Sequence, residues 1–140
     1  MDKRAELFLG LSERLTGFNR GALLGTGMSA AYLRAMDAVL PETMMDDLLA
    51  DARSLDEVLD DATLGPVARN LILLWYCGTW TTLPDAWRAA NGTSPLDTNR
   101  VESADAYQAA LQWVAADAHP AGARQQGFGA WAVAPPTALR

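Results

Sequence analysis

Few residues of this sequence could do acid, base or nucleophilic chemistry. His119 is the single histidine, so a metal site built from several histidines is excluded. It precedes Pro120 in a stretch without helical periodicity, and as a general base it would need a carboxylate such as Asp117 to orient it. A free-standing enzyme using this pair is therefore one alternative. A local hydrogen-bonding role is the ordinary interpretation of such a histidine.

The other motifs with chemical potential are weak. Cys77 is the only cysteine, so neither an internal disulfide nor a cysteine-based zinc or iron–sulfur site can form within the chain. Residues 25–30 fit the dinucleotide pattern G-x-G-x-x-A, but no strand precedes them and no βαβ unit follows. Carboxylate pairs such as Asp46 and Asp47 lie in a solvated acidic run, where general acid catalysis is not expected. We therefore assign no catalytic, cofactor-binding or metal-binding residue.

Charge excludes one class of partner. The 140 residues include 11 Lys and Arg against 17 Asp and Glu, and the pI near 4.6 argues against a protein that tracks a nucleic-acid backbone. Eight of the acids lie between residues 41 and 61 beside one base, Arg53, which gives a local charge of −7. A solvated face is the usual interpretation of such a run. A helical binding module that attracts a cationic partner is a second alternative.

The stretch around which the chain is organised is GPVARNLILLWYCGTW, residues 65–80. It predicts a buried central helix over Pro66–Tyr76 with Pro66 at the first helical position, where its missing N–H costs nothing. Only Arg69 and Asn70 interrupt its apolar surface, so protein must surround it. Eleven residues are too few to cross a bilayer, which needs about 20.

Periodicity and capping signals predict the remaining helices. Apolar residues at 7, 11 and 15 indicate a first helix over residues 3–17, and three glycines indicate a loop over 18–27. A second helix begins near Ser29 and ends before Pro41, and a third carries methionines and leucines at 44, 45, 48 and 49. Ser54 and Glu57 have capping-box spacing for a short fourth helix. Residues 81–101 read as a long ordered loop, after which Ser103 caps a last helix.

These elements predict an all-α protein of one domain, residues 1–140, with five to six helices around the central one. Residues 1–118 form the helical body and residues 119–140 an irregular tail rich in alanine, glycine and proline. The tail carries Phe128 and Trp131, which seldom stay in water because each can bury about 150–250 Å². We expect it to dock on a partner. Charges interrupt the apolar N-terminus, so it does not read as a signal peptide.

Three stretches of the chain resemble a known family. They are Leu-Thr-Gly-Phe at 15–18, Ala-Arg-Asn followed by Leu-Trp-Tyr-x-Gly-x-Trp at 68–80, and His119-Pro120 with Gly-Phe-Gly-x-Trp at 127–131. Together they resemble the small subunit of bacterial membrane-associated FAD-dependent sugar and polyol dehydrogenases, the sorbitol dehydrogenase small-subunit family. The resemblance covers essentially the whole chain.

The resemblance implies a non-catalytic subunit of an oxidoreductase complex. A large flavoprotein of the GMC type would hold FAD and the active site, with a cytochrome c as a further candidate partner, and this chain would support folding and export. It would be periplasmic if a twin-arginine leader has been removed, and otherwise cytoplasmic. Five tryptophans also favour an interface anchored by aromatic residues. The candidate interface residues are Trp75, Tyr76, Trp80, Trp87, His119, Pro120, Phe128 and Trp131.

Overall fold

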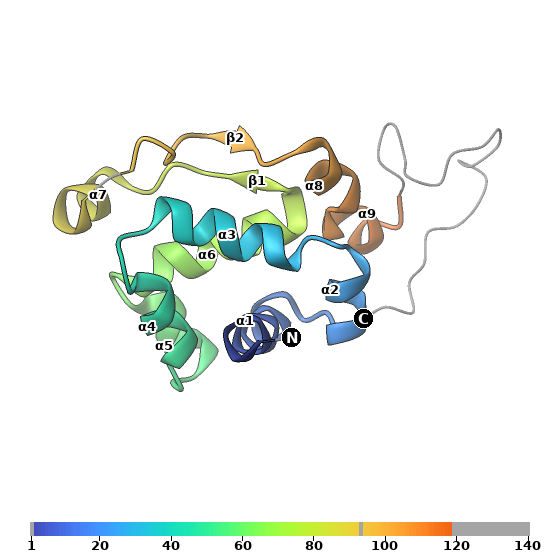
Figure 1. Ribbon diagram of the computed structural model, residues 1–140, viewed down its shortest axis with the longest axis horizontal. Helices are drawn as coiled ribbons and strands as arrows, with labels where there is room; N and C mark the ends of the chain where they lie inside the picture. Colours follow the sequence, from blue (N-terminus) through green and yellow to red (C-terminus); the bar gives the residue numbers. More distant parts are fainter. Residues whose placement is uncertain (1, 93, 119–140) are drawn as a thin grey trace.

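The computed structural model describes residues 2–92 and 94–118, and in this part of the chain helices surround α6, Leu64–Cys77 (Figure 1). In chain order the other elements are α1 (Lys3–Thr16), α2 (Arg20–Gly25), α3 (Ser29–Val39), α4 (Met44–Ala50), α5 (Leu55–Asp60), β1 (Thr79–Trp80), α7 (Asp85–Asn91), β2 (Arg100–Val101), α8 (Ala104–Ala109) and α9 (Leu111–Ala115). The predicted all-α class and single domain are confirmed. Within the described ranges the helical segments are shorter and more numerous than the five or six expected.

The central helix α6 is defined at both ends by specific backbone contacts. The Asp61 side chain accepts hydrogen bonds from the N–H groups of Thr63 and Leu64, both at 2.8 Å, and so satisfies donors that a helix start leaves open. Pro66 is the third helical residue and not the first, which is equally compatible with its missing N–H. Gly78 ends the helix in the left-handed conformation, with φ of 68°.

The N-terminal helices begin and end as local side chains dictate. Asp2 caps α1 by accepting from the N–H of Ala5, and Gly17 ends the helix at a φ of 78°. The predicted loop over residues 18–27 is wrong in its middle, because α2 lies there. The Asn19 side chain accepts from the N–H of Ala22 and thereby starts a six-residue helix despite the glycines.

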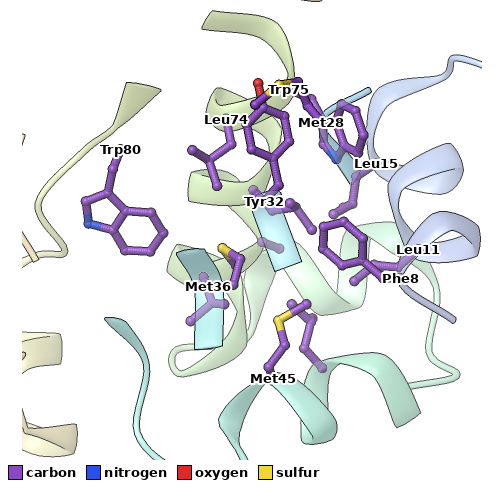
Figure 2. Close-up of a cluster of buried hydrophobic side chains, with 14 of the residues drawn as sticks. Phe8, Leu11, Leu15, Met28, Tyr32, Met36, Met45, Leu74, Trp75 and Trp80 are labelled. Carbon is purple, nitrogen blue, oxygen red and sulfur yellow. The ribbon is translucent and has the colours of Figure 1, made fainter. Parts of the chain in front are cut away.

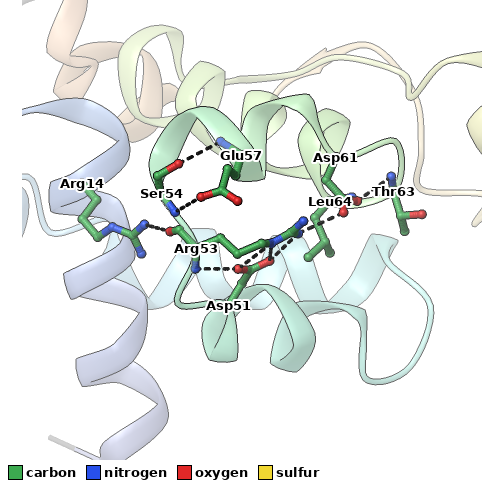
Figure 3. Close-up of polar contacts among 8 residues, drawn as sticks. All are labelled: Arg14, Asp51, Arg53, Ser54, Glu57, Asp61, Thr63 and Leu64. Carbon is green, nitrogen blue, oxygen red and sulfur yellow. Dashed lines mark hydrogen bonds and ion pairs between the residues drawn. The ribbon is translucent and has the colours of Figure 1, made fainter.

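A chain of polar contacts joins α4 to α5 and α6 (Figure 3). Ser54 and Glu57 form the predicted capping box at the start of α5. Arg53 pairs with Asp51 at 2.7 Å and with Asp61 at 2.9 Å, and its carbonyl oxygen accepts from Arg14 of α1. The acidic run therefore contributes to the architecture and is not simply a solvated face.

The predicted loop over residues 81–101 contains regular structure. The two residues before it pair with its last two residues as an antiparallel ladder, Thr79 opposite Val101 and Trp80 opposite Arg100, and α7 lies between the strands. The predicted last helix is divided into α8 and α9 because Ala110 has an extended backbone, with ψ of 134°. Figure 1 shows α7 at one end of the molecule's long axis and α8 and α9 at the other.

The core forms where α1, α3 and α6 meet (Figure 2). Trp75 of α6 is one of its largest side chains, and the centroid of its ring lies 4.9 Å from that of Tyr32 in an edge-to-face arrangement and 6.3 Å from that of Phe8. Aromatic pairs prefer such geometry because the ring edge is positive and the face negative. The other core side chains labelled in Figure 2 are Leu11, Leu15, Met28, Met36, Met45, Leu74 and Trp80. No helix of the described residues is both long enough and apolar enough to span a membrane.

The backbone conformation at position 78 and the close packing around it both require glycine, so Gly78→Ala should strongly destabilise the protein. A Cβ at this position would lie 2.7 Å from the backbone carbon and oxygen of Ala106, and the φ of 68° disfavours other residues. Strain of this kind costs about 1–3 kcal/mol before the clash is counted. We expect the free energy of unfolding, measured by urea titration, to fall by at least that amount.

Gly10→Ala is the matched control. Gly10 lies inside α1, and a Cβ there would meet nothing within 4 Å. Because alanine favours helix over glycine, the same titration should show a gain of roughly 0.5–1 kcal/mol. Equal effects of the two substitutions would contradict the packing described around Gly78.

The Asp61 carboxylate makes the stability of the protein depend on pH in the acidic range. The hydrogen bond from the Leu64 N–H, with further bonds from Arg53 and Thr63, lowers the pKa of Asp61 from 3.8 to about 2. The ionised Asp61 carboxylate adds to the free energy of unfolding at pH values above the pKa that the group has in the unfolded chain. This stabilisation is lost as the pH falls from about 4 towards 2, because protonation then favours the unfolded chain. Thermal unfolding of Asp61→Asn should depend less on pH in this window. Asp60→Asn, which changes a neighbouring exposed side chain, should retain the wild-type dependence.

Candidate partner-binding surface

Trp75 lies inside the chain and does not form part of its surface. Its indole is 1% exposed, and its Nε1 donates to the hydroxyl of Ser12 on α1 at 3.0 Å. Ser12 is itself fully buried, so this hydrogen bond joins two core residues that lie 63 positions apart. The contact fixes α1 against α6.

Trp80 and Trp87 are also buried, at 1% and 6% exposure. The indole of Trp80 donates to Asp97 at 2.8 Å, and that of Trp87 donates to the carbonyl oxygen of Thr63 at 2.7 Å. Buried indoles are stable where the N–H finds such an acceptor. The prediction that Trp75, Trp80 and Trp87 present a partner surface is therefore corrected for this conformation of the chain: their side chains pack within it.

Asp97 is a buried carboxylate that the sequence analysis missed. It is 3% exposed, and it accepts from the indole of Trp80 and from the N–H of Leu83 at 3.1 Å. Its second oxygen lies 3.1 Å from Nε of Arg88 on α7, an ion pair whose angle falls short of a hydrogen bond. A buried charge needs such partners to offset its desolvation. No local signal predicts this role, because the partners Trp80, Leu83 and Arg88 lie 17, 14 and 9 residues before Asp97 in the sequence.

Tyr76 is the one candidate on α6 that reaches the surface in part. Its hydroxyl donates to the carbonyl oxygen of Thr16 at 2.7 Å, and its ring meets that of Phe18 edge to face at 5.9 Å. The next residue, Cys77, carries a partly buried free thiol. Two of the stretches that carry the family resemblance, residues 15–18 and 74–80, thus meet at the C-terminal ends of α1 and α6.

The remaining candidates, His119, Pro120, Phe128 and Trp131, lie outside the described residues. Asp117, the proposed carboxylate partner of His119, follows α9 and is exposed. The pairing of these two residues therefore stays a prediction.

The structure adds an aromatic pair that the interface candidates did not include. The rings of Tyr107 on α8 and Trp113 on α9 lie 5.4 Å apart edge to face, and the indole donates to the carbonyl oxygen of Tyr107 at 2.8 Å. Both side chains are partly exposed. Their position just before residue 118 places partly exposed aromatic surface next to the point where the tail begins.

A shallow apolar groove of about 270 Å³ lies between α1, α2 and α3. Its most exposed large side chain is Leu24, 41% exposed. The residues that line it are Ala5, Leu24, Gly27, Ser29, Ala30 and Leu33. Apolar surface of this kind is a candidate for contact with another polypeptide segment.

The acidic face is partly neutralised within the chain. Arg4 of α1 pairs with Asp37 and Asp46, and Arg53 pairs with Asp51 and Asp61. The hydrogen bonds from Arg53 lower the pKa of Asp51. Within the described residues, the acids of α4, α5 and the preceding turn that form no ion pair are Glu42, Asp47, Asp56, Glu57 and Asp60.

The G-x-G-x-x-A match of residues 25–30 has a structural role here. Gly25 ends α2, and Gly27 supplies a φ of 72° in the turn that leads into α3, with no strand before it. Among the described residues no group of three or more potential ligands could hold a metal ion.

Comparison with known proteins adds no relative: no family model, curated protein or solved structure matches this chain.

Proposed function

We propose that this chain is a non-catalytic small subunit of an FAD-dependent sugar or polyol dehydrogenase. Its partner would be a larger GMC-type flavoprotein that holds FAD, and this chain would support the folding and export of that partner. The support comes from the resemblance together with the packing of the residues that carry it. Identification of the proteins that co-purify with the chain from its native source tests the proposal directly.

One observation carries the proposal: two of the resembling stretches form a single packed unit. Tyr76 donates to Thr16 and its ring packs on Phe18, while Trp75 meets α1 through Ser12. Gly78 allows the backbone of α8 to approach closely. A resemblance in residues that contact one another supports a shared fold more strongly than separate matches in unrelated places.

The partner surface proposed here lies near the C-terminal helices. The Tyr107–Trp113 pair and the tail would form its aromatic part, in line with the enrichment of tyrosine and tryptophan at interfaces. The buried indoles of α6 and β1 would act indirectly, by fixing the helices that present this surface. A cytochrome c that accepts electrons from the flavoprotein would be a further partner of the complex.

Catalysis in the assembled complex should survive the loss of the only histidine. If the active site lies wholly on the flavoprotein, His119→Ala should leave turnover within a few-fold of wild type. Removal of a true general base typically costs about 10²–10⁴ in rate. Steady-state sugar oxidation by complexes with equal FAD content measures the difference. A loss of that size would instead support the free-standing alternative, in which His119 acts with Asp117.

Truncation after Gly122 should separate folding from association. The described helices end before this residue, so circular dichroism should show the same helicity as the full chain. Pull-down of the flavoprotein should weaken by at least roughly tenfold for each aromatic anchor lost, since about 1.4 kcal/mol corresponds to one decade. An unchanged pull-down would assign the interface to another surface, and collapse of the helicity would assign Phe128 and Trp131 to this chain's own core.

A further inference from the structure

The groove between α1, α2 and α3 has the size and lining of a site that binds apolar side chains of a polypeptide. Its volume of about 270 Å³ is below the roughly 300–1,000 Å³ typical of small-molecule pockets. Its lining is mostly aliphatic, with the hydroxyl of Ser29 as its one polar side-chain group. Such a groove suits one or two apolar side chains of a polypeptide better than a polar metabolite.

The chain itself contains a segment of the required composition within reach. Residues 119–140 follow the end of the described structure and include Phe128 and Trp131. Nine residues separate position 118 from Phe128, and fully extended they span about 30 Å. In Figure 1, α2 beside the groove and α9 before the tail lie at the same end of the long axis. The distance is therefore no obstacle.

Charge favours attraction of this segment to the body of the chain as a whole. Residues 1–118 carry nine basic and 17 acidic residues, a net charge of −8. Residues 119–140 carry two arginines, Arg124 and Arg140, and no acid, a net charge of +2. A cationic segment tethered to an acidic body is attracted to it, and tethering raises its effective concentration to about the millimolar range.

We propose that in the free protein residues 127–131 bind in the groove of their own chain, with Trp131 packed against Leu24, Ala30 and Leu33. This inference concerns the chain without a partner and does not rest on the proposed function. The bound segment would cover apolar surface of the groove that would otherwise face water.

The test uses the full chain with 5-fluorotryptophan in place of tryptophan and ¹⁹F NMR as the readout. Trp131→Phe assigns the Trp131 resonance. In the wild type we expect this resonance to be displaced from the position of the free amino acid and protected from solvent. Leu24→Asp places a charge in the groove and should move the resonance to the free position. Leu24→Ser, a milder change, should move it part of the way and serves if the aspartate disrupts α2.

Leu96→Asp is the matched control, because Leu96 is 50% exposed and does not line the groove. It should leave the Trp131 resonance unchanged, and circular dichroism should show equal helicity in all variants. A wild-type Trp131 resonance at the free position overturns the proposal. So does a resonance that neither Leu24 substitution moves. A displacement that disappears on tenfold dilution assigns the groove to a second copy and overturns the own-chain assignment.

Discussion

Burial of α6 is the constraint on which the rest of the described structure depends. This helix is apolar around most of its circumference, so it is stable only when other helices cover it. The covering elements are then held in register by polar contacts that reach α6 from distant parts of the chain. Ser12 accepts from Trp75, the Thr16 carbonyl accepts from Tyr76, and Asn70 bonds the backbone of Thr81 in both directions. Apolar burial supplies the stability, and these few hydrogen bonds fix which neighbour lies where.

The elements that could be predicted from the sequence are those with local causes. The helix of residues 3–16 has a leucine repeat and a glycine stop, and the capping box of Ser54 and Glu57 is itself a sequence pattern. The short helices α2 and α7 were missed because glycine or proline near them outweighed a weak helical signal. The break at Ala110 was missed for a different reason: no residue type there requires an extended backbone, so tertiary packing must impose it.

The burial of the predicted interface tryptophans likewise depends on residues that are distant in the sequence. The number of tryptophans favoured an aromatic interface in the sequence analysis, but it could not distinguish a buried indole from an exposed one. What decides the matter is whether the indole N–H finds an internal acceptor. For Trp75, Trp80 and Trp87 the acceptors are Ser12, Asp97 and Thr63, which lie 17 to 63 residues away in sequence. No single-sequence pattern encodes such a pairing.

A motif that recurs because it holds a fold together differs from one that recurs because it binds a partner. In this chain the Leu-Trp-Tyr-x-Gly-x-Trp stretch holds the fold together, since Trp75, Gly78 and Trp80 each have a packing role within it. A resemblance based on it therefore supports a common architecture first, and a common partner only through the surface that this architecture presents. That surface must be sought among side chains that contacts within this chain leave partly exposed. Tyr107, Trp113 and Leu24 meet this condition. Tyr107 and Trp113 belong to α8 and α9, which pack on α6, and Leu24 belongs to α2, which packs on α1.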